Sequence, residues 1–527
     1  MFLRMMRKLD AALSVLLLAG ISFAQEAPAT QPSRRGAITR PTSQPAEEES
    51  PIVTTHQLII GNQTIDYTAT TGMIALKDDA GKSRAKIFFV AYEKTAADDS
   101  DRADRPVTFV FNGGPGAAAI WLHMGCVGPK VVALAEGGAP PAPPYHLQDN
   151  PYTWLSTTDL VLIDPVGTGY SRPEGDPQRA RDFYSVRGDI DGVSDFIRIY
   201  LTKYQRWLSP KFLCGESYGT TRAAGLSEQL HDRYGIDLNG IFLLSTVLNF
   251  QTIDFDAGND TPYPLFLPTY TAIAHYHKKL SPDLQVNMTK TVAQAEAWAM
   301  GEYSSALSKG SSLSDAERDK VAQQLSRYTG LPLEYVKRSN LRISPHRFEK
   351  ELLADQSRVI GRMDGRFSGH NADPLNDTPE FDPTLSGYVG PFSSTFNDYV
   401  RRTLKYENDL NYEFLSPRVG PWDFGTNGNG FLNVATTLRR AMTKLPAMKI
   451  MICSGYYDLA TPFTAADFTV NQMPLDKSLR ANFVQKYYEG GHMFYLNPSA
   501  HEALKRDVDE FYQTALKGSA NSGSPKD

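Results

Sequence analysis

Short apolar runs recur along the chain and predict the strands of a central sheet. Runs rich in Val, Ile, Leu and Phe that are bounded by Gly, Pro or Asp are typical of buried strands. Such runs lie at 86–92, 107–112, 159–164, 212–213, 240–245, 448–453 and 483–488. Ahead of them, 56–68 and 73–76 are predicted to form the arms of an opening hairpin.

Apolar residues at helical spacing fill intervals between these runs. The positions that recur in this way ahead of the run at 212–213 are Val186, Ile190, Val193, Ile197 and Tyr200. After that run, 221–230 continues with helical character. Strands that alternate with helices imply an α/β fold with a mostly parallel sheet and right-handed crossovers.

The pattern changes between 250 and 430. Long helical stretches occur at 268–280, 290–308 and 314–328, and a polar tract rich in Pro and Gly follows at 361–390. We interpret 250–430 as a helical cap inserted into a core that comprises 52–249 and 431–517. A separate domain is the alternative interpretation.

The first 24 residues have the pattern of a secretory signal peptide. An apolar segment at 11–24 follows basic residues at positions 4, 7 and 8 and ends in Ser22-Phe23-Ala24, which places small residues where signal peptidase cleaves. We expect cleavage before Gln25. A membrane anchor is the alternative, but it needs about 18 to 20 apolar residues, and this segment has fewer and carries Asp10 at its edge.

Two further segments are predicted to lack a fold. Residues 25–51 are rich in Pro, Ala, Thr, Ser and Glu and cannot build a core, so they are predicted to be a disordered linker. Residues 518–527 are predicted to be a flexible tail. About 475 residues remain, and with 41% hydrophobic residues over the whole chain they suffice for one large core with an insertion or for two domains.

Charge and cysteine content narrow the function classes. The formal net charge is −5, with no basic block, which argues against nucleic acid as a partner. The chain has three cysteines, Cys126, Cys214 and Cys453, and two of them lie at the ends of predicted buried strands. Disulfides are therefore not expected to form its framework, although we expect export.

The sequence Gly215-Glu216-Ser217-Tyr218-Gly219 matches the G-x-S-x-G pattern of a nucleophile elbow. A surface loop could produce the same five residues. Here the pentapeptide follows an apolar run and precedes a helical pattern, which favours a strand-to-helix corner with the Ser217 hydroxyl exposed.

A serine nucleophile needs a base and an acid to orient that base. Of the ten histidines, His492 is the candidate base, because it follows a predicted strand and two glycines that let the loop turn back. Asp458 is the candidate acid, just beyond the end of the strand at 448–453, with Asp164 as the fallback. The order Ser217, Asp458, His492 is that of the α/β-hydrolase fold. Since acid and base follow 250–430, the sheet must close around that segment.

Four blocks in order resemble the serine carboxypeptidase family and span most of the chain. They are Asn112-Gly113-Gly114-Pro115-Gly116, then Asn150-Pro151-Tyr152-Thr153-Trp154 with the 162–171 segment, Gly215-Glu216-Ser217-Tyr218-Gly219, and Gly491-His492-Met493. The resemblance implies a triad of Ser217, Asp458 and His492. It also implies an oxyanion hole from the backbone of Gly114 and Tyr218, and binding of the substrate's terminal carboxylate by Asn112, Gly113 and Glu216.

Two positions depart from the family pattern. Ala117 stands where the family usually has a disulfide-bonded cysteine, and Cys126 stands where it usually has a glutamate that partners the elbow Glu216. The missing carboxylate predicts a preference for acid pH that extends less far towards neutrality. A purely structural role for Glu216 in the elbow turn is the alternative.

These observations predict a secreted or periplasmic serine carboxypeptidase that acts on peptide or protein C-termini. No metal or other cofactor is expected, and His275 and His277 do not form a metalloprotease signature. The rival functions are an esterase or acyltransferase on the same scaffold and a catalytically silent binding protein. The residues preferred around the scissile bond and the oligomeric state stay open.

Overall fold

A computed structural model describes residues 50–425 and 429–520. The chain divides into Met1–Ser50 and Pro51–Asp527, and only the second unit is described below. The predicted signal peptide, nearly all of the predicted linker and most of the predicted tail lie outside the described residues.

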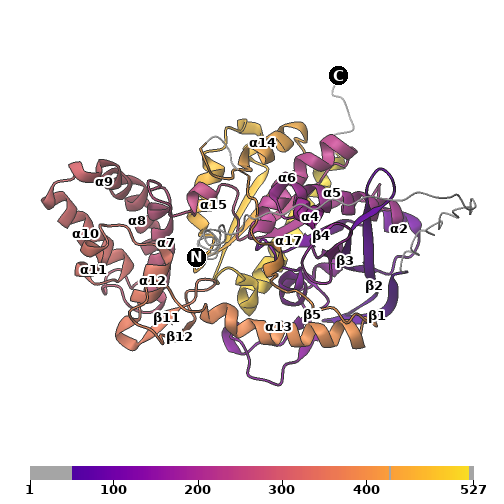
Figure 1. Ribbon diagram of the computed structural model, residues 1–527, viewed down its shortest axis with the longest axis horizontal. Coiled ribbons are helices and arrows are strands. Elements are labelled where there is room, and N and C mark those ends of the chain that lie inside the picture. The colour runs from indigo at the N-terminus through magenta and orange to yellow at the C-terminus, as the bar shows by residue number, and fades with distance from the viewer. Residues whose placement is uncertain (1–49, 426–428, 521–527) are drawn as a thin grey trace, which may run out of the picture. The chain divides into compact units, whose positions relative to one another are not determined.

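A large sheet forms the centre of the second unit, with strand order β1-β2-β3-β7-β4-β9-β10-β13-β14 and β8 paired to β3 (Figure 1). From β7 to β14 neighbouring strands are parallel, whereas β1, β2, β3 and β7 pair antiparallel. The prediction of an α/β fold with a mostly parallel sheet is therefore confirmed. The bounds are β1 Ile52–Ile60, β2 Gln63–Lys77, β3 Ser83–Lys94, β4 Val107–Phe111, β7 Asp159–Ile163, β8 Arg172–Pro173, β9 Lys211–Glu216, β10 Gly240–Leu244, β13 Lys449–Gly455 and β14 Phe483–Tyr488.

The opening hairpin turns earlier than its sequence pattern predicted. Strand β1 ends at Ile60 and β2 begins at Gln63, so the turn is made by Gly61, with φ 58°, and Asn62. Glycine tolerates the positive φ that a two-residue hairpin turn requires at its first position. The apolar pattern that runs across this turn concealed it, and 56–68 is therefore not one arm.

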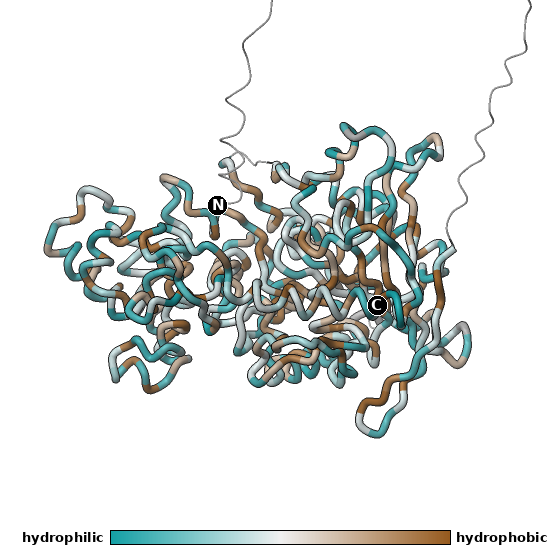
Figure 2. The backbone as a smooth tube through the Cα atoms, turned by 60° about the horizontal axis from the view of Figure 1, so that its bottom comes forward, coloured by the Kyte–Doolittle hydropathy of each residue, from teal (hydrophilic) through white to brown (hydrophobic). Residues whose placement is uncertain are grey.

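Side chains on the two faces of the sheet enter two different cores. In β4, Phe109 and Phe111 pack in a cluster with α5 (Val186–Lys203), α6 (Tyr218–Tyr234) and α14 (Ala435–Lys444). Val110, between them, packs in the cluster that includes α13 (Pro383–Arg402) and α17 (Pro498–Ala520). Figure 2 shows hydrophobic segments gathered along the strands, as expected for a sheet covered on both faces.

The first part of the chain between β10 and β13, residues 262–351, is mainly helical and has a core of its own. Its helices are α7 Pro262–Tyr276, α8 Met288–Trp298, α9 Ser304–Lys309, α10 Asp315–Thr329, α11 Leu333–Arg338 and α12 Pro345–Glu351. Leu459 and Phe463, which follow β13, belong to the same hydrophobic cluster. This sharing ties the insertion to the sheet. The boundaries 250 and 430 stay predictions.

The polar tract at 361–390 is more regular than its composition suggested. It contains β12 (Ser368–His370), paired with β11 (Arg358–Ile360), and the first turns of α13 from Pro383. Asp382 caps α13 by accepting hydrogen bonds from the backbone N–H groups of Thr384 and Leu385, and Pro383 fits the first helical position.

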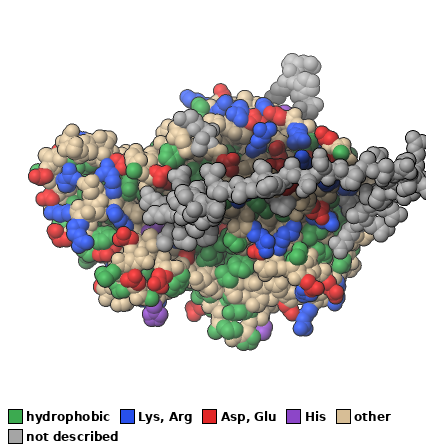
Figure 3. All heavy atoms as spheres, in the orientation of Figure 1, with side chains coloured by type: hydrophobic (Ala, Val, Ile, Leu, Met, Phe, Trp, Pro, Cys, Tyr) green, Lys and Arg blue, Asp and Glu red, His purple; other side chains and the backbone are tan. Residues whose placement is uncertain are grey.

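The remaining elements are short, and the surface over the inserted helices is mixed in charge. They are α2 Asp99–Asp104, α3 Ile120–Leu122, α4 Pro177–Ala180, α15 Phe463–Asn471, α16 Lys477–Arg480 and the pair β5 Lys130–Val132 and β6 Leu147–Asp149. Figure 3 shows Lys and Arg interspersed with Asp and Glu over the region of α9 to α11. No helix among the described residues is long and apolar enough to cross a membrane.

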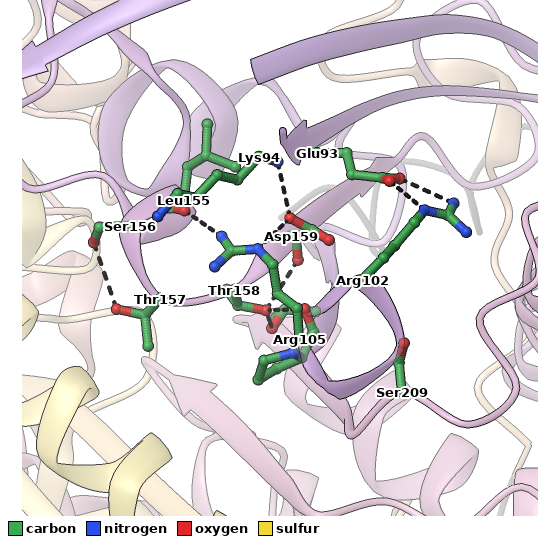
Figure 4. A network of polar contacts seen from close by, with 12 residues as sticks. Glu93, Lys94, Arg102, Arg105, Leu155, Ser156, Thr157, Thr158, Asp159 and Ser209 are labelled. Carbon is green, nitrogen blue, oxygen red and sulfur yellow. Dashed lines mark hydrogen bonds and ion pairs between the residues drawn. The ribbon is translucent and has the colours of Figure 1, made fainter. Parts of the chain in front are cut away.

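A buried polar network ties together the amino ends of the central strands (Figure 4). Asp159, the first residue of β7, accepts hydrogen bonds from the Lys94 backbone N–H at 3.1 Å and from the Arg105 Nε at 2.7 Å. Its second oxygen accepts one from the fully buried Arg206 at 2.7 Å. This network lies at the opposite ends of the strands from the carboxyl ends, where sites in such sheets form.

Candidate active site

Ser217 occupies the sharp corner between β9 and α6 that the sequence predicted. Its backbone has φ 60° and ψ −130°, a conformation that residues with a side chain rarely adopt. The two glycines of the elbow pass each other closely, since a Cβ added to Gly215 would lie 2.2 Å from the Gly219 carbonyl oxygen. Only glycine fits there, and the turn presents the serine at the end of the strand.

Asp458 and His492 follow β13 and β14, and they meet beside the elbow. Asp458 Oδ2 accepts a hydrogen bond from His492 Nδ1 at 2.8 Å. Oδ1 accepts from the backbone N–H groups of Ala460 at 2.8 Å and Thr461 at 3.0 Å. The Thr461 hydroxyl lies 2.8 Å from Asp458 Oδ2, so the carboxylate is surrounded by donors and fully buried.

Two hydrogen bonds fix the backbone of His492. Its backbone N–H donates to the Met363 carbonyl at 2.5 Å, and its carbonyl accepts from the Ser245 hydroxyl at 2.6 Å. Burial lowers the pKa of His492, but the charges of Asp458 and Glu216 outweigh burial and hold this pKa above its usual value. The imidazole is thus prepared to take up a proton.

Ser217 and His492 line one cavity of about 200 Å³. In the part of the chain that the structure describes, no hydrogen bond joins the two side chains. Nucleophile–base contacts in unliganded enzymes are often long and tighten only with substrate. Access of both groups to one cavity is what a shared reaction requires.

The backbone of the Asn112-Gly113-Gly114 block passes directly under the elbow. A Cβ added to Gly113 would lie 2.4 Å from the Tyr218 backbone nitrogen, so a side chain is excluded at this position. Gly114 follows with φ 100°. Both Gly114 and Tyr218 line the cavity with Ser217, as residues that donate to an oxyanion must.

Glu216 accepts hydrogen bonds from two side chains. Asn112 was predicted as a site residue, and Tyr495 was not. Glu216 Oε2 accepts from Asn112 Nδ2 at 2.9 Å and from the Tyr495 hydroxyl at 2.6 Å. Burial raises the pKa of Glu216 to about 7, while the charge of His492 and the Tyr495 hydrogen bond act against this rise. Oε1 has no partner among the described residues, and Glu216 lines the cavity.

The two departures from the family pattern lie close to this carboxyl group. Cys126 is fully buried, and burial, together with the neighbouring Cys214 and Glu216, raises the pKa of its thiol. Ala117 lines the cavity. The three cysteines are free. A neutral thiol thus stands near Glu216, and the phenol of Tyr495 donates the hydrogen bond.

Asp164, the fallback acid, has other contacts. Its Oδ1 accepts from the Ala119 backbone N–H at 2.8 Å and from the Tyr412 hydroxyl at 3.2 Å. Within the described residues it has no contact with His492. It holds the loop after β4, and Asp458 is the acid that lies against the histidine.

Several residues of the site have no signal in the sequence. Thr461 and Tyr495 lie within three residues of the predicted acid and base, but nothing in their spacing indicates a contact. Arg222 of α6 is buried, pairs with Asp189 of α5 at 2.7 Å and donates to the Asn112 carbonyl at 2.6 Å. The aromatic and aliphatic residues that line the cavity come from distant segments: Trp121, Val247, Phe250, Ile253, Leu385 and Leu415.

Comparison with known proteins assigns this geometry to a family. The family model described as serine carboxypeptidase matches residues 61–499. The chain belongs to the serine carboxypeptidase family. It is accordingly a serine-type carboxypeptidase of the α/β-hydrolase fold, as the four sequence blocks predicted.

Solved structures match the chain at low sequence identity. Kex1Δp, a prohormone-processing carboxypeptidase of Saccharomyces cerevisiae, is 16% identical with a TM-score of 0.52, and the match covers 85% of this chain and 91% of that one. A proline iminopeptidase of Mycobacterium smegmatis is 11% identical with a TM-score of 0.34 and coverage of 88% and 100%. A search of curated protein sequences found no significant match.

Proposed function

We propose that this serine carboxypeptidase removes C-terminal residues from peptides through an acyl-enzyme on Ser217. One observation carries the assignment of residues: Ser217, His492 and Glu216 line the same cavity, and Asp458 holds His492 from behind at 2.8 Å. A nucleophile, its base and a group suited to a free carboxyl terminus are thereby gathered at the carboxyl ends of β9, β13 and β14.

The reaction has two halves. His492 Nε2 takes the proton of Ser217 as the hydroxyl oxygen attacks the scissile carbonyl, and Asp458 stabilises the imidazolium that forms. Backbone N–H groups of Gly114 and Tyr218 bind the oxyanion. His492 then protonates the leaving amine, and water hydrolyses the acyl-enzyme with the same histidine as base.

Recognition of the free C-terminus is assigned to Asn112, Gly113 and Glu216. Two carboxylates at hydrogen-bond distance repel each other, so Glu216 must carry a proton when it binds the substrate carboxylate. Because Oε2 already accepts from Asn112 and Tyr495, the proton belongs on Oε1, which is free to donate. Binding of free acids, and not of amides, is the expected signature.

A substrate panel tests the function. Blocked dipeptides with a free C-terminus, their C-terminal amides and short-chain esters are assayed with the unmutated enzyme and with Ser217→Ala. We expect hydrolysis of the free acids to exceed that of the amides, to disappear in the variant and to accompany labelling of Ser217 by a fluorophosphonate. Turnover of esters without turnover of free peptides would instead establish an esterase, and absence of labelling would leave a binding protein.

Export is a further part of the proposal, and it rests on the pattern of the first 24 residues. We expect the mature chain to begin near Gln25 and to be soluble in the cell envelope or medium. N-terminal sequencing after fractionation measures this. A full-length chain in a membrane pellet that salt and carbonate cannot wash would contradict it.

A further inference from the structure

Arg362 lines the active-site cavity and carries a permanent positive charge. Among the described residues that line the cavity, it is the one arginine, no lysine lines it, and Glu216 is the one acid. Met363, Leu385 and Met493 line the same cavity, and Arg362 is partly buried. A cation that lines a substrate cavity is a candidate for substrate recognition.

The backbone of Arg362 is held rigidly next to the catalytic histidine. The Arg362 carbonyl accepts from the Leu459 N–H at 3.1 Å, and the carbonyl of the next residue, Met363, accepts from the His492 N–H at 2.5 Å. The N–H of Met363 donates to Asp382 Oδ2 at 2.9 Å. The segment between β11 and β12 therefore presents Arg362 from a fixed platform.

The guanidinium has no ion-pair partner within the described residues. Asp382 is the nearby acid, but its oxygens accept hydrogen bonds from the backbone N–H groups of Met363, Thr384 and Leu385. Asp364 pairs with Arg366 at 2.7 Å. Burial raises the pKa of Asp382 and the charge of Arg362 acts against this rise, but the two side chains form no ion pair, so the guanidinium is left available to a group that enters the cavity.

The position of Arg362 bears on whether it binds the terminal carboxylate of a peptide or the side chain of its last residue. Burial lowers the pKa of His492, and the charge of Arg362 likewise opposes the rise in this pKa that Asp458 causes. Met363, the residue next to Arg362, accepts the hydrogen bond from the His492 N–H, so Arg362 enters the cavity from the His492 side.

A leaving residue has two fixed points in this cavity, its carboxylate at Asn112 and Glu216 and its amine at His492. Its side chain branches off between these two points, and the backbone of Arg362 and Met363 lies next to His492. We propose that Arg362 selects peptides whose C-terminal residue is acidic, glutamate or aspartate, by pairing with that side chain. This inference rests on the proposed carboxypeptidase function.

The test compares blocked dipeptides that share the penultimate residue and end in Glu, Gln, Lys or Leu. Assay at pH 5.5 keeps the substrate side chain ionised, since its ordinary pKa is about 4.3. A charge-assisted hydrogen bond in a partly enclosed site corresponds to a Glu-to-Gln ratio in kcat/KM of about 10 to 100. We expect Arg362→Gln to bring this ratio close to one, Arg362→Lys to retain part of it, and Arg362→Glu to favour Lys over Gln.

Arg347→Gln provides the matched control, because Arg347 is exposed on α12 of the same insertion and does not line the cavity. It should keep the ratio of the unmutated enzyme. Product inhibition of the unmutated enzyme by free glutamate, expected to be stronger than by glutamine, needs no variant at all. Labelling by a fluorophosphonate shows that each variant has an intact elbow.

Results that contradict the role of Arg362 differ from results that contradict the carboxypeptidase function. A ratio near one in the unmutated enzyme, with all four peptides hydrolysed, would overturn the role of Arg362 and leave the carboxypeptidase function intact. An equal loss for all four peptides in Arg362→Gln would place the guanidinium on the terminal carboxylate and also overturn the proposal. Hydrolysis of none of the peptides would instead refute the proposed function.

Discussion

The pKa of Glu216 is set by burial, by the charge of His492 and by Tyr495, without a second carboxyl group beside it. Cys126 stands at the place of the family's second glutamate, and burial, not a neighbouring carboxylate, raises the pKa of Glu216 to about 7. Tyr495 donates to the ionised form as well, which limits the rise. The proton needed to bind a substrate carboxylate is therefore present below about neutral pH and is lost above it.

The KM of a free-acid peptide should accordingly rise as the pH passes through about 7, while the KM of the C-terminal amide stays flat. Glu216→Gln should remove this rise, because an amide donates without titrating. Tyr495→Phe removes a donor that lowers the pKa of Glu216, so the rise should move upward by roughly one pH unit. KM measured between pH 5 and 8.5 for acid and amide decides, and identical profiles for the two substrates would show that Glu216 only supports the turn.

The triad supports a second prediction at the same scale. Ser217→Ala and His492→Ala should each remove nearly all turnover, and the double variant should be no worse, since the residues act as one unit. Asp458→Asn should lower kcat by about 10⁴, because the amide favours the wrong histidine tautomer. Single-turnover kinetics with a peptide measure these losses. Retention of more than a small percentage of kcat by either alanine variant would refute the assignment.

Residues that lie at strand ends were accessible from the sequence, and residues that reach the site across space were not. Ser217, Asp458 and His492 each follow a predicted strand, and the order of the three is characteristic of the fold. Thr461, Tyr495 and Arg362 reach the site only because the loops after β13, β14 and β11, respectively, converge there. Such a convergence leaves no trace in local spacing.

At the scale of elements, the packing of α5 against α6 supports the site through one buried ion pair. Arg222 and Asp189 are both almost completely buried and pair at 2.7 Å, and Arg222 also donates to the Asn112 carbonyl. The strands and the two helices were predicted from apolar spacing. The charged pair between them was not, because a helical pattern does not show which polar residues face inward.

Arg222→Met should destabilise the protein by about 3 kcal/mol, since it leaves Asp189 buried without its partner. Adding Asp189→Leu should recover much of this loss, because the unpaired charge is then removed. Urea unfolding at pH 7 measures both. Arg440→Met is the matched control: Arg440 pairs with Glu228 of α6 at 2.6 Å but is 47% exposed, so its loss should cost less than about 1 kcal/mol. Equal costs for the two pairs would contradict this ranking.

Across the whole molecule, the Asp159 network and the active site lie at opposite ends of the strands. The Asp159 network binds the amino ends of the sheet together, and the site occupies the carboxyl ends. The insertion contributes Arg362 and Met363 to the lining of the cavity. The fold class followed from the alternation of strands and helices, but the path of the insertion back to His492 depends on tertiary contacts alone.

The ionisation of Asp164 makes the free energy of unfolding of the protein depend on pH. Burial raises its pKa from an ordinary 3.8 to about 7, against the opposing hydrogen bonds from Ala119 and Tyr412. Between these values the native state holds a proton that the unfolded chain releases. The contribution of the neutral carboxyl group is therefore fully present below about pH 3.8 and is lost as the pH rises to about 7.

Asp164→Asn removes this titration, because its amide is neutral at every pH. The free energy of unfolding of the variant, relative to the unmutated protein, should therefore increase between pH 4 and 7 by up to about 4 kcal/mol, at about 1.4 kcal/mol per pH unit, and then level off. Chemical denaturation at half-unit pH steps measures the difference. Asp79→Asn, in an exposed turn after β2, should show no such slope. A constant difference for Asp164→Asn across this range would mean that the buried carboxyl group is already ionised in the native state, where a bound cation or a rearranged donor would have to compensate its charge.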